Sequence, residues 1–458
     1  MEIGPLKSFA IKARTDLLKE VGARLDVVLA PGSSARLENA SQVVAIEKLV
    51  ARGGRDAIIE RVAYTWFNRI IALRFMDANG YTGVGVVSPE AGHDGGQPEV
   101  LANAKAGTFD SSVVPDSVVV EVSALISKSR PSQDPQGEAY GLLLEAYCHH
   151  WHKHMNFMFE KEADYTELLV PTSLLSADSL RDRAVKVLTK DVCKDVEVIG
   201  WLYQFYILER KDEVFAGFKM NKKAGADEIP AATQLFTPHW IVRYLVENSL
   251  GRLWMLNHPN SGLVKRMDYY IAPVDEEADF LKITKPEDLK IIDPACGSGH
   301  MLTYAFDLLY AIYEEEGYSP SEIPGLILTH NLYGTEIDGR AGSLAAFALT
   351  MKARSKQRTF FNKEVESNIC VIEPISFTQV ELSYLVTKDG DRHAEEAFWN
   401  QFAEADTLGS LIRPNPELTV RLSRYLKALD DDGDIYKAIA IERAWVVIRQ
   451  AEYLMQRY

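Results

Sequence analysis

The sequence predicts an α/β protein in which a mainly helical N-terminal part precedes a doubly wound domain with a parallel sheet. Two observations carry this prediction. Through much of the first 220 positions, apolar residues recur at three- and four-residue spacing, which is the period of an amphipathic helix. After residue 230, short apolar runs that end in Gly or Asp alternate with helical patterns. Alternation of strands and helices is typical of a parallel sheet.

Composition narrows the class of protein. The chain has 458 residues, and 50 basic against 65 acidic side chains give a net charge of −15. This composition is that of an ordinary soluble globular protein and excludes disordered and fibrous classes. At about 100–200 residues per domain, the length predicts two to four domains. The acidic balance argues against a general nucleic-acid coat, but a local basic cleft stays compatible with it.

The short apolar runs and the scattered cysteines predict a cytoplasmic protein. No run approaches the roughly 18 residues that a membrane-spanning helix requires, so no membrane partner is expected. The N-terminus has neither the apolar core nor the cleavage site of a signal peptide. The four cysteines form no CxxC pair, so we expect reduced thiols in place of a disulfide framework or a zinc site.

The helical part divides at polar breaks. A short amphipathic helix is expected in the first 40 residues, ending at APGSS (30–34). A stronger helix follows, because seven apolar residues share one face and Asn79-Gly80 ends the pattern. These seven are Ile59, Val62, Ala63, Trp66, Phe67, Ile70 and Ile71. Residues 80–112 are rich in Gly and Pro and predict a long loop.

A second polar break at 127–138 precedes helical patterns from about 139 to 220. The charged segment NKKAGADEIP (221–230) is the best candidate domain boundary. We therefore expect a helical N-terminal domain over 1–225 and a second domain over 226–458.

The sequence pattern of the second domain predicts strands and helices in alternation. Strands are expected in LKIIDPACGSGH (289–300), LYGTEID (332–338) and ESNICVIEPI (366–375). Helices are expected over 301–316, which Gly317 follows, and over 339–354. Residues 376–458 return to mainly helical patterns.

The first strand carries the strongest chemical signal, in Asp293 and the glycines that follow it. Gly297 and Gly299 lack Cβ, so the backbone can turn tightly and approach a ligand closely. The helix that opens there presents unpaired N–H groups to a ligand carboxylate. Asp293, at the carboxyl end of the strand, can accept a hydrogen bond from a ligand ammonium. A ligand with both groups has an amino-acid end.

The second strand ends in Glu336, where α/β folds commonly place an acid that binds ribose hydroxyls. A ligand with an amino-acid end and a nucleoside end is S-adenosylmethionine. The alternative is purely structural: the glycines make a tight turn and Glu336 caps the next helix. The combination and order of the two features favour the functional interpretation.

Three segments resemble motifs of adenine-N6 DNA methyltransferases. DPACGSGHML (293–302) resembles motif I, whose consensus is close to DPACGSGxFL, and NLYGTEID (331–338) resembles the motif II region. QLFTPHWIV (234–242) resembles motif X, which precedes motif I in the class that includes type I modification subunits. The resemblance implies a Rossmann-like S-adenosylmethionine-dependent methyltransferase domain that needs no metal.

The resemblance also implies a set of cofactor-binding residues. In the family, the Thr-Pro turn of motif X encloses the methionine end of the cofactor, and a polar residue after the third strand lies near its adenine ring. The implied positions are Phe236, Thr237, Pro238, Asp293, Pro294, Ala295, Gly297, Gly299, Glu336, Ile337 and Glu373. By themselves, Thr237-Pro238 also fit a plain helix start, and Glu373 also fits a helix cap or loop.

Helical segments before residue 220 add a resemblance to the large single-chain methyltransferases of BREX phage-defence systems, the PglX type. They are AYTWFNRIIALRFMDANGY (63–81) and GWLYQFYILERKDEVF (200–215). The resemblance implies methyl transfer to adenine N6 in a specific double-stranded DNA sequence, with the target base flipped out of the duplex. Other phage-defence proteins are possible partners by the same resemblance.

One family feature is missing from the sequence. Adenine-N6 methyltransferases carry Asn or Asp, then Pro-Pro, then Tyr or Phe, and no such tetrapeptide occurs here. Asn415-Pro416 is followed by Glu417 and predicts a turn. The family places the tetrapeptide after a further helix, so we expect a chain truncated before this motif, with no catalytic residue of its own.

Two other functions stay open on sequence grounds. The chain is compatible with a non-catalytic cofactor-binding and assembly module of a phage-defence complex. A nicotinamide dehydrogenase on a similar fold is disfavoured, because Leu302 stands where GxGxxG requires its third glycine.

Two polar runs predict surface structure in place of metal sites. His150 and His154 are four residues apart on a predicted helix, but no partner pair with zinc spacing follows. The acidic run 430–434 resembles part of a calcium loop, yet Ile441 occupies the position that requires a bidentate Glu.

Overall fold

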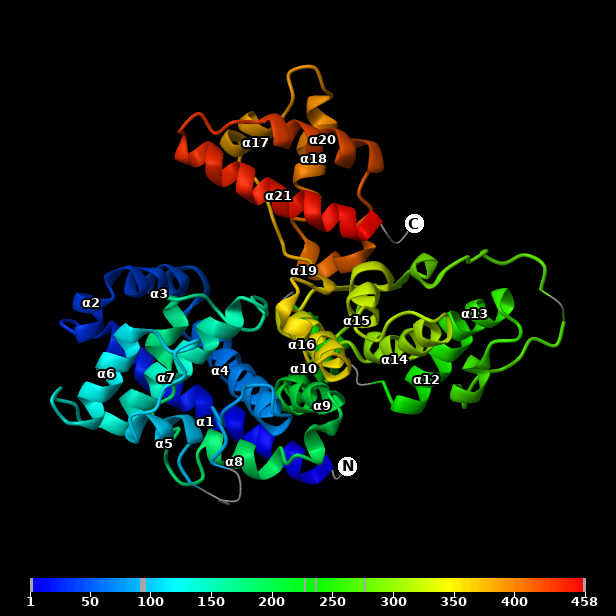
Figure 1. Cartoon of the computed structure of the whole chain (residues 1–458). Coiled ribbons are helices and arrows are strands. Elements are labelled where there is room, and N and C mark those ends of the chain that lie inside the picture. The colour runs from blue at the N-terminus through cyan, green and yellow to red at the C-terminus, as the bar shows by residue number, and fades with distance from the viewer. Residues whose placement is uncertain (1–2, 91–95, 226–227, 235–236, 276, 456–458) are drawn as a thin grey trace. The chain divides into compact units, whose positions relative to one another are not determined.

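The computed structural model describes residues 3–90, 96–225, 228–234, 237–275 and 277–455. The chain divides into two compact units, Met1–Glu209 and Arg210–Tyr458 (Figure 1). The described residues are mostly helical and include one three-stranded parallel sheet. Helices combined with a parallel sheet were the predicted class, which is confirmed in this coarse form. None of the described helices has the length and apolar content needed to cross a membrane.

The N-terminal unit is built from helices alone, as far as its residues are described. Its α-helices are α1 (Ile3–Leu29), α2 (Ser34–Glu38), α3 (Ala40–Gly53), α4 (Arg55–Ala78), α5 (Glu99–Lys105), α6 (Asp116–Ile126), α7 (Pro135–His152), α8 (Leu180–Val187) and α9 (Glu197–Tyr206). Short 3-10 helices are η1 (Tyr165–Leu169) and η2 (Val192–Lys194).

Aromatic residues from α1, α4 and α9 form the centre of this unit. The Phe67 ring of α4 lies 6.1 Å from Phe9 of α1 and 4.6 Å from Tyr206 of α9, between ring centroids. Trp66 is fully buried, and its indole N–H donates to the carbonyl of Thr166 at 3.0 Å. The predicted apolar face of this helix is therefore the core-facing side of α4, and Asn79 ends the helix as predicted.

Two expectations for the N-terminal unit were wrong in extent. The first helix is long, because its buried positions continue from Leu6 to Val28 at helical spacing before the predicted break. The predicted loop 80–112 contains the helix α5. Gly-rich flanks concealed this short helix, which the structure stabilises through contacts with α6 and α7.

Asp77, at the end of α4, organises the start of that loop. Its carboxylate accepts hydrogen bonds from the backbone N–H groups of 86–88 at 2.8–3.2 Å and from the hydroxyl of Thr82 at 2.8 Å. Glu99 of α5 accepts the N–H of Gly85 at 2.6 Å. Half-buried carboxylates thus satisfy the backbone donors of a segment that lacks regular structure.

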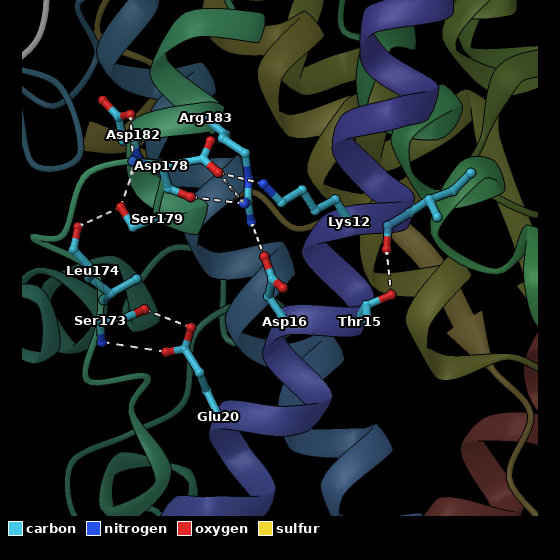
Figure 2. A network of polar contacts seen from close by, with 11 residues as sticks. Lys12, Thr15, Asp16, Glu20, Ser173, Leu174, Asp178, Ser179, Asp182 and Arg183 are labelled. Carbon is cyan, nitrogen blue, oxygen red and sulfur yellow. Dashed lines mark hydrogen bonds and ion pairs between the residues drawn. The ribbon is translucent and has the colours of Figure 1, made fainter.

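A polar network joins α1 to α8 and to the segment before α8 (Figure 2). Arg183 donates to Asp16 at 2.7 Å, and Lys12 pairs with Asp178. Further along α1, Glu20 accepts the hydroxyl of Ser173 at 2.6 Å. These contacts connect positions about 150–170 residues apart in the sequence, so they fix tertiary packing within the unit.

The C-terminal unit contains the sheet. Its strands are β1 (Ile291–Asp293), β2 (Leu332–Glu336) and β3 (Asn368–Val371). Its α-helices are α10 (Leu208–Lys219, which begins at the end of the first unit), α11 (Ile229–Thr233), α12 (His239–Val246), α13 (Arg252–Asn257), α14 (His300–Glu315), α15 (Ile323–Leu326), α16 (Gly339–Lys356), α17 (Gln379–Leu385), α18 (Arg392–Trp399), α19 (Ala405–Leu408), α20 (Pro416–Ala428) and α21 (Ile435–Met455). Shorter turns of helix are η4 (Glu247–Gly251), η5 (Gly262–Arg266), η6 (Pro286–Asp288), η7 (Ile327–Asn331), η8 (Phe360–Asn362) and η9 (Gly409–Leu411).

The three strands are parallel and lie in the order β1-β2-β3. Asp293 pairs with Gly334, and Glu336 pairs with Val371. The predicted strands and both predicted helices, α14 and α16, are confirmed, and Gly317 follows the end of α14 as predicted. Because parallel strands end at the same edge, the chemistry-bearing ends of β1 and β2 come together.

Two hydrophobic cores support the sheet within this unit. One core surrounds α12, α14 and α16 and includes the buried residues Trp254 and Phe306. The other lies among α17–α21, where Trp399 is fully buried and α21 packs against α17 and α20 (Figure 1). The predicted return to helical structure after residue 376 is confirmed.

Candidate functional site

The loop from β1 to α14 contains the two glycines of the predicted motif. Gly297 and Gly299 have φ values of 55° and 87°, a region that side-chain-bearing residues rarely adopt. A Cβ on Gly299 would lie 3.1 Å from both Cα and Cβ of Ala345. The first turn of α14 therefore approaches α16 so closely that only glycine fits at this position.

Hydrogen bonds to β2 hold this loop in place. The N–H of Cys296 donates to the carbonyl of Thr335 at 3.0 Å, and the Thr335 hydroxyl donates to the carbonyl of Pro294 at 2.8 Å. Cys296 and Thr335 are buried. Burial also raises the pKa of the Cys296 thiol well above its ordinary value, so this thiol stays protonated. The loop conformation is therefore set by the neighbouring strand as well as by its own turn.

Asp293 lies at the end of β1, where the loop begins. Its Oδ1 accepts the N–H of Ala295 at 3.2 Å, and among the described residues its Oδ2 accepts no hydrogen bond. Burial raises the pKa of this carboxyl group above its ordinary value. A cationic group placed against Oδ2 would stabilise the charged form and complete the hydrogen bonding of the carboxylate.

Glu336, at the end of β2, is directly connected to the glycine loop. Its Oε2 accepts the N–H of Gly297 at 2.7 Å, while Oε1 accepts the N–H groups of Ile337 and Asp338 at 2.9 and 3.0 Å. The side chain is buried, and burial raises the pKa of this carboxyl group. The next helix is capped by Asp338, which accepts the N–H of Arg340 at 3.0 Å. Glu336 is therefore not the cap of that helix, and its carboxylate faces the loop.

Gly334 allows β2 to lie against its neighbours. A Cβ at this position would lie 2.7 Å from Cδ1 of Ile369 on β3 and 3.0 Å from Sγ of Cys296. It would also lie 3.0 Å from Cδ1 of Leu302 on α14. The sheet, the loop and the helix are therefore packed together at the base of the site.

The motif X segment is only partly described. Phe236 lies outside the described residues, whereas Thr237 is half-buried and the exposed Pro238 occupies the N-cap position of α12. The side-chain nitrogen of Gln234 lies 3.5 Å from the point that a Cβ on Gly297 would occupy. The start of this segment thus lies beside the glycine loop.

Contacts with α14 fix α12. The Tyr304 hydroxyl donates to Glu247 at 2.6 Å, and Arg243 donates to Tyr304 at 3.3 Å. Glu247 is fully buried, and its other oxygen accepts the N–H of Tyr269 at 2.5 Å. This buried carboxylate holds α12 and the helix of the glycine loop in a defined relation.

Glu373, the predicted residue after β3, is exposed, and its backbone bonds with Gln450 of α21. Its N–H donates to the Gln450 side chain at 3.0 Å. Ile337 packs against η9, where a Cβ on Gly409 would lie 2.8 Å from its Cγ2. Gln450 and Gly409 lie outside the three motifs, and only tertiary contacts bring them to these positions.

The other polar runs differ in exposure: most of 430–434 is exposed, whereas the histidines of 149–154 are half-buried. His149 bonds with Glu167 at 2.6 Å, and the rings of His150 and His154 lie 6.4 Å apart. Among the described residues, no group of three or more His, Cys, Asp and Glu side chains could hold a metal ion. The run 430–434 lies between α20 and α21, and its last residue accepts the N–H of Tyr436 at 2.8 Å. The four cysteines are free and buried.

The site combines a parallel strand, a glycine loop at the start of a helix, and an acid at the end of the next strand. This combination is typical of α/β proteins that bind nucleotides and related cofactors. No protein-family model matches the chain. The chain is 36% identical over 452 residues to the adenine-specific methyltransferase BrxX of Escherichia coli O9:H4 (strain HS). It is 33% identical over 471 residues to the adenine-specific methyltransferase PglX of Lacticaseibacillus casei (strain Zhang).

Both alignments cover 90% of this chain but only 36% and 38% of the respective relatives. The chain therefore spans little more than a third of their length. The resemblance to adenine-specific methyltransferases of the PglX type, predicted from the motifs, is confirmed over nine-tenths of the chain.

Proposed function

We propose that this chain provides the S-adenosylmethionine-binding part of a DNA adenine-N6 methyltransferase that acts in bacterial phage defence. The observation that carries the proposal is the hydrogen bond from the Gly297 N–H to Glu336 at 2.7 Å. It brings the glycine loop and the acidic strand end to one place, in a chain similar to two adenine-specific methyltransferases. In this proposal, residues 226–458 belong to a Rossmann-like methyltransferase domain and residues 1–225 form a helical N-terminal domain.

The residues present fit this cofactor. The Oδ2 atom of Asp293 is available for the ligand ammonium. A Cβ would intrude on the space beside Gly297, so glycine leaves room for the methionine end. Oε2 of Glu336 accepts one hydrogen bond, from Gly297, and so has capacity left to accept a ribose hydroxyl. We assign the remaining contacts by resemblance to Phe236, Thr237, Pro238, Pro294, Ala295, Gly299, Ile337 and Glu373.

When bound, S-adenosylmethionine supplies the methyl group that is transferred to N6 of a DNA adenine. This chain's own residues would bind and orient the cofactor. The substrate, double-stranded DNA, and the activity belong to the proposal for the whole protein, and the location of bacterial DNA implies the cytoplasm. Partners among other phage-defence proteins are part of the same proposal.

Calorimetric titration of S-adenosylmethionine tests the proposal directly. We expect the 458-residue chain to bind one equivalent, and Asp293→Ala to weaken binding at least tenfold, because a charge-assisted hydrogen bond contributes about 1.5–3 kcal/mol. Asp389→Ala is the matched control, because Asp389 is an exposed aspartate in the loop between α17 and α18. A folded wild-type chain that binds no cofactor would contradict the proposal.

A non-catalytic cofactor-binding and assembly module is the second candidate. It is favoured by one observation: the sequence contains a single Asn-Pro pair, Asn415-Pro416, and this Asn caps α20 by accepting the N–H of Leu418 at 3.1 Å. Cofactor binding without methyl transfer to DNA, together with loss of partner binding on deletion of residues 1–220, would favour this candidate.

A further inference from the structure

Arg69 is a buried cation in the N-terminal unit, far from the glycine motif in the sequence. It lies on α4, and its side chain is fully buried, at 1% exposure. Among the described residues, its Nε and Nη2 atoms have no hydrogen-bond partner. A buried charge is strongly unfavourable unless hydrogen bonds and an opposite charge compensate it. This guanidinium therefore requires an acceptor.

The two unpartnered nitrogens belong to one edge of the guanidinium, where the Nε–H and Nη2–H donors are parallel and form a fork. Two other arginines of this unit show what such a fork binds. In Arg55, both atoms contact the carboxylate of Asp26 at 2.8–3.3 Å. In Arg36, they donate to two backbone carbonyls at 3.2 and 2.8 Å. The same fork recognises carboxylate and phosphate groups in a bidentate manner.

Trp66 and the 3-10 helix η1 fix the place of this guanidinium. The central carbon of the Arg69 guanidinium lies 4.8 Å from the centroid of the Trp66 ring, which is a cation–π contact. Trp66 is itself held by its hydrogen bond to the carbonyl of Thr166 in η1. The ring compensates part of the buried charge, but it offers no acceptor to the two edge donors.

The neighbouring carboxyl groups do not supply that acceptor. Burial raises the pKa of Glu145 to about 8; the charge of Glu167 adds to the rise and Arg69 opposes it. Near pH 7, Glu145 is therefore mostly uncharged. Glu167 bonds with His149 at 2.6 Å. Burial also raises the pKa of Glu160, again opposed by Arg69, although this side chain reaches solvent. The buried part of the cluster thus retains the positive charge of Arg69.

We infer that the N-terminal unit contains an oxoanion site, in which the Nε and Nη2 donors of Arg69 bind a phosphate or carboxylate group of a small ligand. The inference is independent of the proposed function, because α4 and η1 belong to the unit without the glycine loop. A second cation approaches the same 3-10 helix, since Nε of Arg24 donates to the carbonyl of Leu168 at 2.9 Å. Residues 160–163, just before η1, are exposed and belong to no helix, so this segment can open with little loss of packing.

Thermal unfolding in different anions tests the inference. The 458-residue chain is unfolded in chloride, in inorganic phosphate and in acetate at equal ionic strength, and hydrogen exchange of α4 and α7 reports on the N-terminal unit. We expect the Tm of this unit to rise by about 2–5 °C at ten times the Kd of the bound anion. A larger rise in phosphate assigns a phosphate-bearing ligand, and a larger rise in acetate assigns a carboxylate.

Substitutions of Arg69 separate specific binding from general effects of salt. Arg69→Met should unfold in chloride at the Tm of wild type or above it, because an unpaired buried charge is replaced by an apolar side chain. Its additional rise in phosphate or acetate should stay below about 1 °C. Arg69→Lys keeps the charge without the fork and should bind the anion at least about fivefold more weakly. Arg55→Met is the matched control on the same helix and should keep the full response.

Two results would overturn the inference. Equal rises in wild type and Arg69→Met would mean that the anions act by exclusion from the protein surface. A Tm of Arg69→Met far below wild type in chloride, without any anion response in wild type, would mean that Arg69 pairs internally with an acid such as Glu145. Neither result depends on whether S-adenosylmethionine binds, so this inference and the proposed function can fail separately.

Discussion

At the scale of single residues, Gly299 combines two constraints that only glycine meets. Its φ of 87° is left-handed, and a Cβ there would lie 3.1 Å from the Cα of Ala345. Gly299→Ala should lower the free energy of unfolding by about 1–3 kcal/mol, because the left-handed conformation alone costs roughly 1–2 kcal/mol with a side chain. Urea denaturation measures this change.

Gly141 offers the matched control for that substitution. It lies inside α7, and a Cβ there would meet no atom within 4 Å. Gly141→Ala should leave the protein equally stable or more stable by about 0.5–1 kcal/mol, as expected for Ala in an open helical position. Equal effects of the two substitutions would show that the Gly299 backbone is not under the constraint described.

Glu145 makes the stability of the N-terminal unit depend on pH. Burial on α7, with the negative charge of Glu167 nearby, raises the pKa of this carboxyl group to about 8. A carboxyl group whose pKa is raised on folding contributes stability that is complete below its unfolded pKa, about 4.3, and is lost as the pH rises toward 8. The folded state must otherwise hold a poorly solvated charge.

Glu145→Gln should remove this dependence. Relative to the variant, wild type should lose unfolding free energy between about pH 5 and 8, by at most about 1.4 kcal/mol per pH unit. Denaturant unfolding at pH 5, 6.5 and 8 gives the comparison. Parallel stability profiles for the two proteins would mean that Glu145 titrates normally.

At the scale of elements, the capping of α20 distinguishes a structural Asn-Pro pair from a catalytic one. The Asn415 side chain accepts the N–H of Leu418 at 3.1 Å, and Pro416 occupies the first helical turn. Asn415→Ala should therefore cost about 1 kcal/mol of unfolding free energy, the usual effect of losing an N-cap. Asn415→Asp should retain most of the stability.

Cofactor affinity is the second readout for these cap variants. The hydrogen bonds of Asn415 are to Leu418 and Thr419 of α20, so both variants should bind S-adenosylmethionine like wild type. A large loss of affinity in a folded Asn415→Asp protein would argue that this segment belongs to the ligand site.

Elements with a local signal were predictable. The strand at 291–293 and the helix after it followed from an apolar run, two glycines and helical spacing, and all three appear as β1, the loop and α14. The short helix α5 was hidden by glycine-rich flanks, since its stability comes from neighbouring helices. Local sequence patterns indicate local conformation, whereas they do not indicate which distant segments will pack against an element.

The candidate site also contains residues that were predictable from the sequence and residues that were not. The positions of Asp293 and Glu336 followed from the rule that parallel strands end at one edge, and the structure brings both to the glycine loop. Gln234 is the first residue of the motif X segment. Its distance to Gly297 and its bond from Lys211 are properties of the folded chain.

At the scale of the whole molecule, the division into two compact units predicts where ligand binding is felt. A ligand stabilises the unit that binds it by about 2.7 kcal/mol when its concentration is 100 times Kd. Hydrogen exchange with saturating S-adenosylmethionine should therefore slow in β1, β2 and α14. Amides of α1–α9 should exchange at unchanged rates, because that unit has its own aromatic core.

Slowed exchange in α4 or α9 on cofactor addition would contradict this independence. The comparison needs a control ligand of similar size, for which 5′-methylthioadenosine is suitable. A change seen only with S-adenosylmethionine would connect the amino-acid end of the site to the N-terminal unit.

The close packing around the glycine loop limits how far the site can yield. Gly299 rests on Ala345 of α16 and Gly334 faces Ile369, so the sheet side has no spare volume. The opposite wall carries Gln234, held by two hydrogen bonds to its backbone. The loop is therefore held from both sides, so a ligand meets a site that is largely formed before it binds.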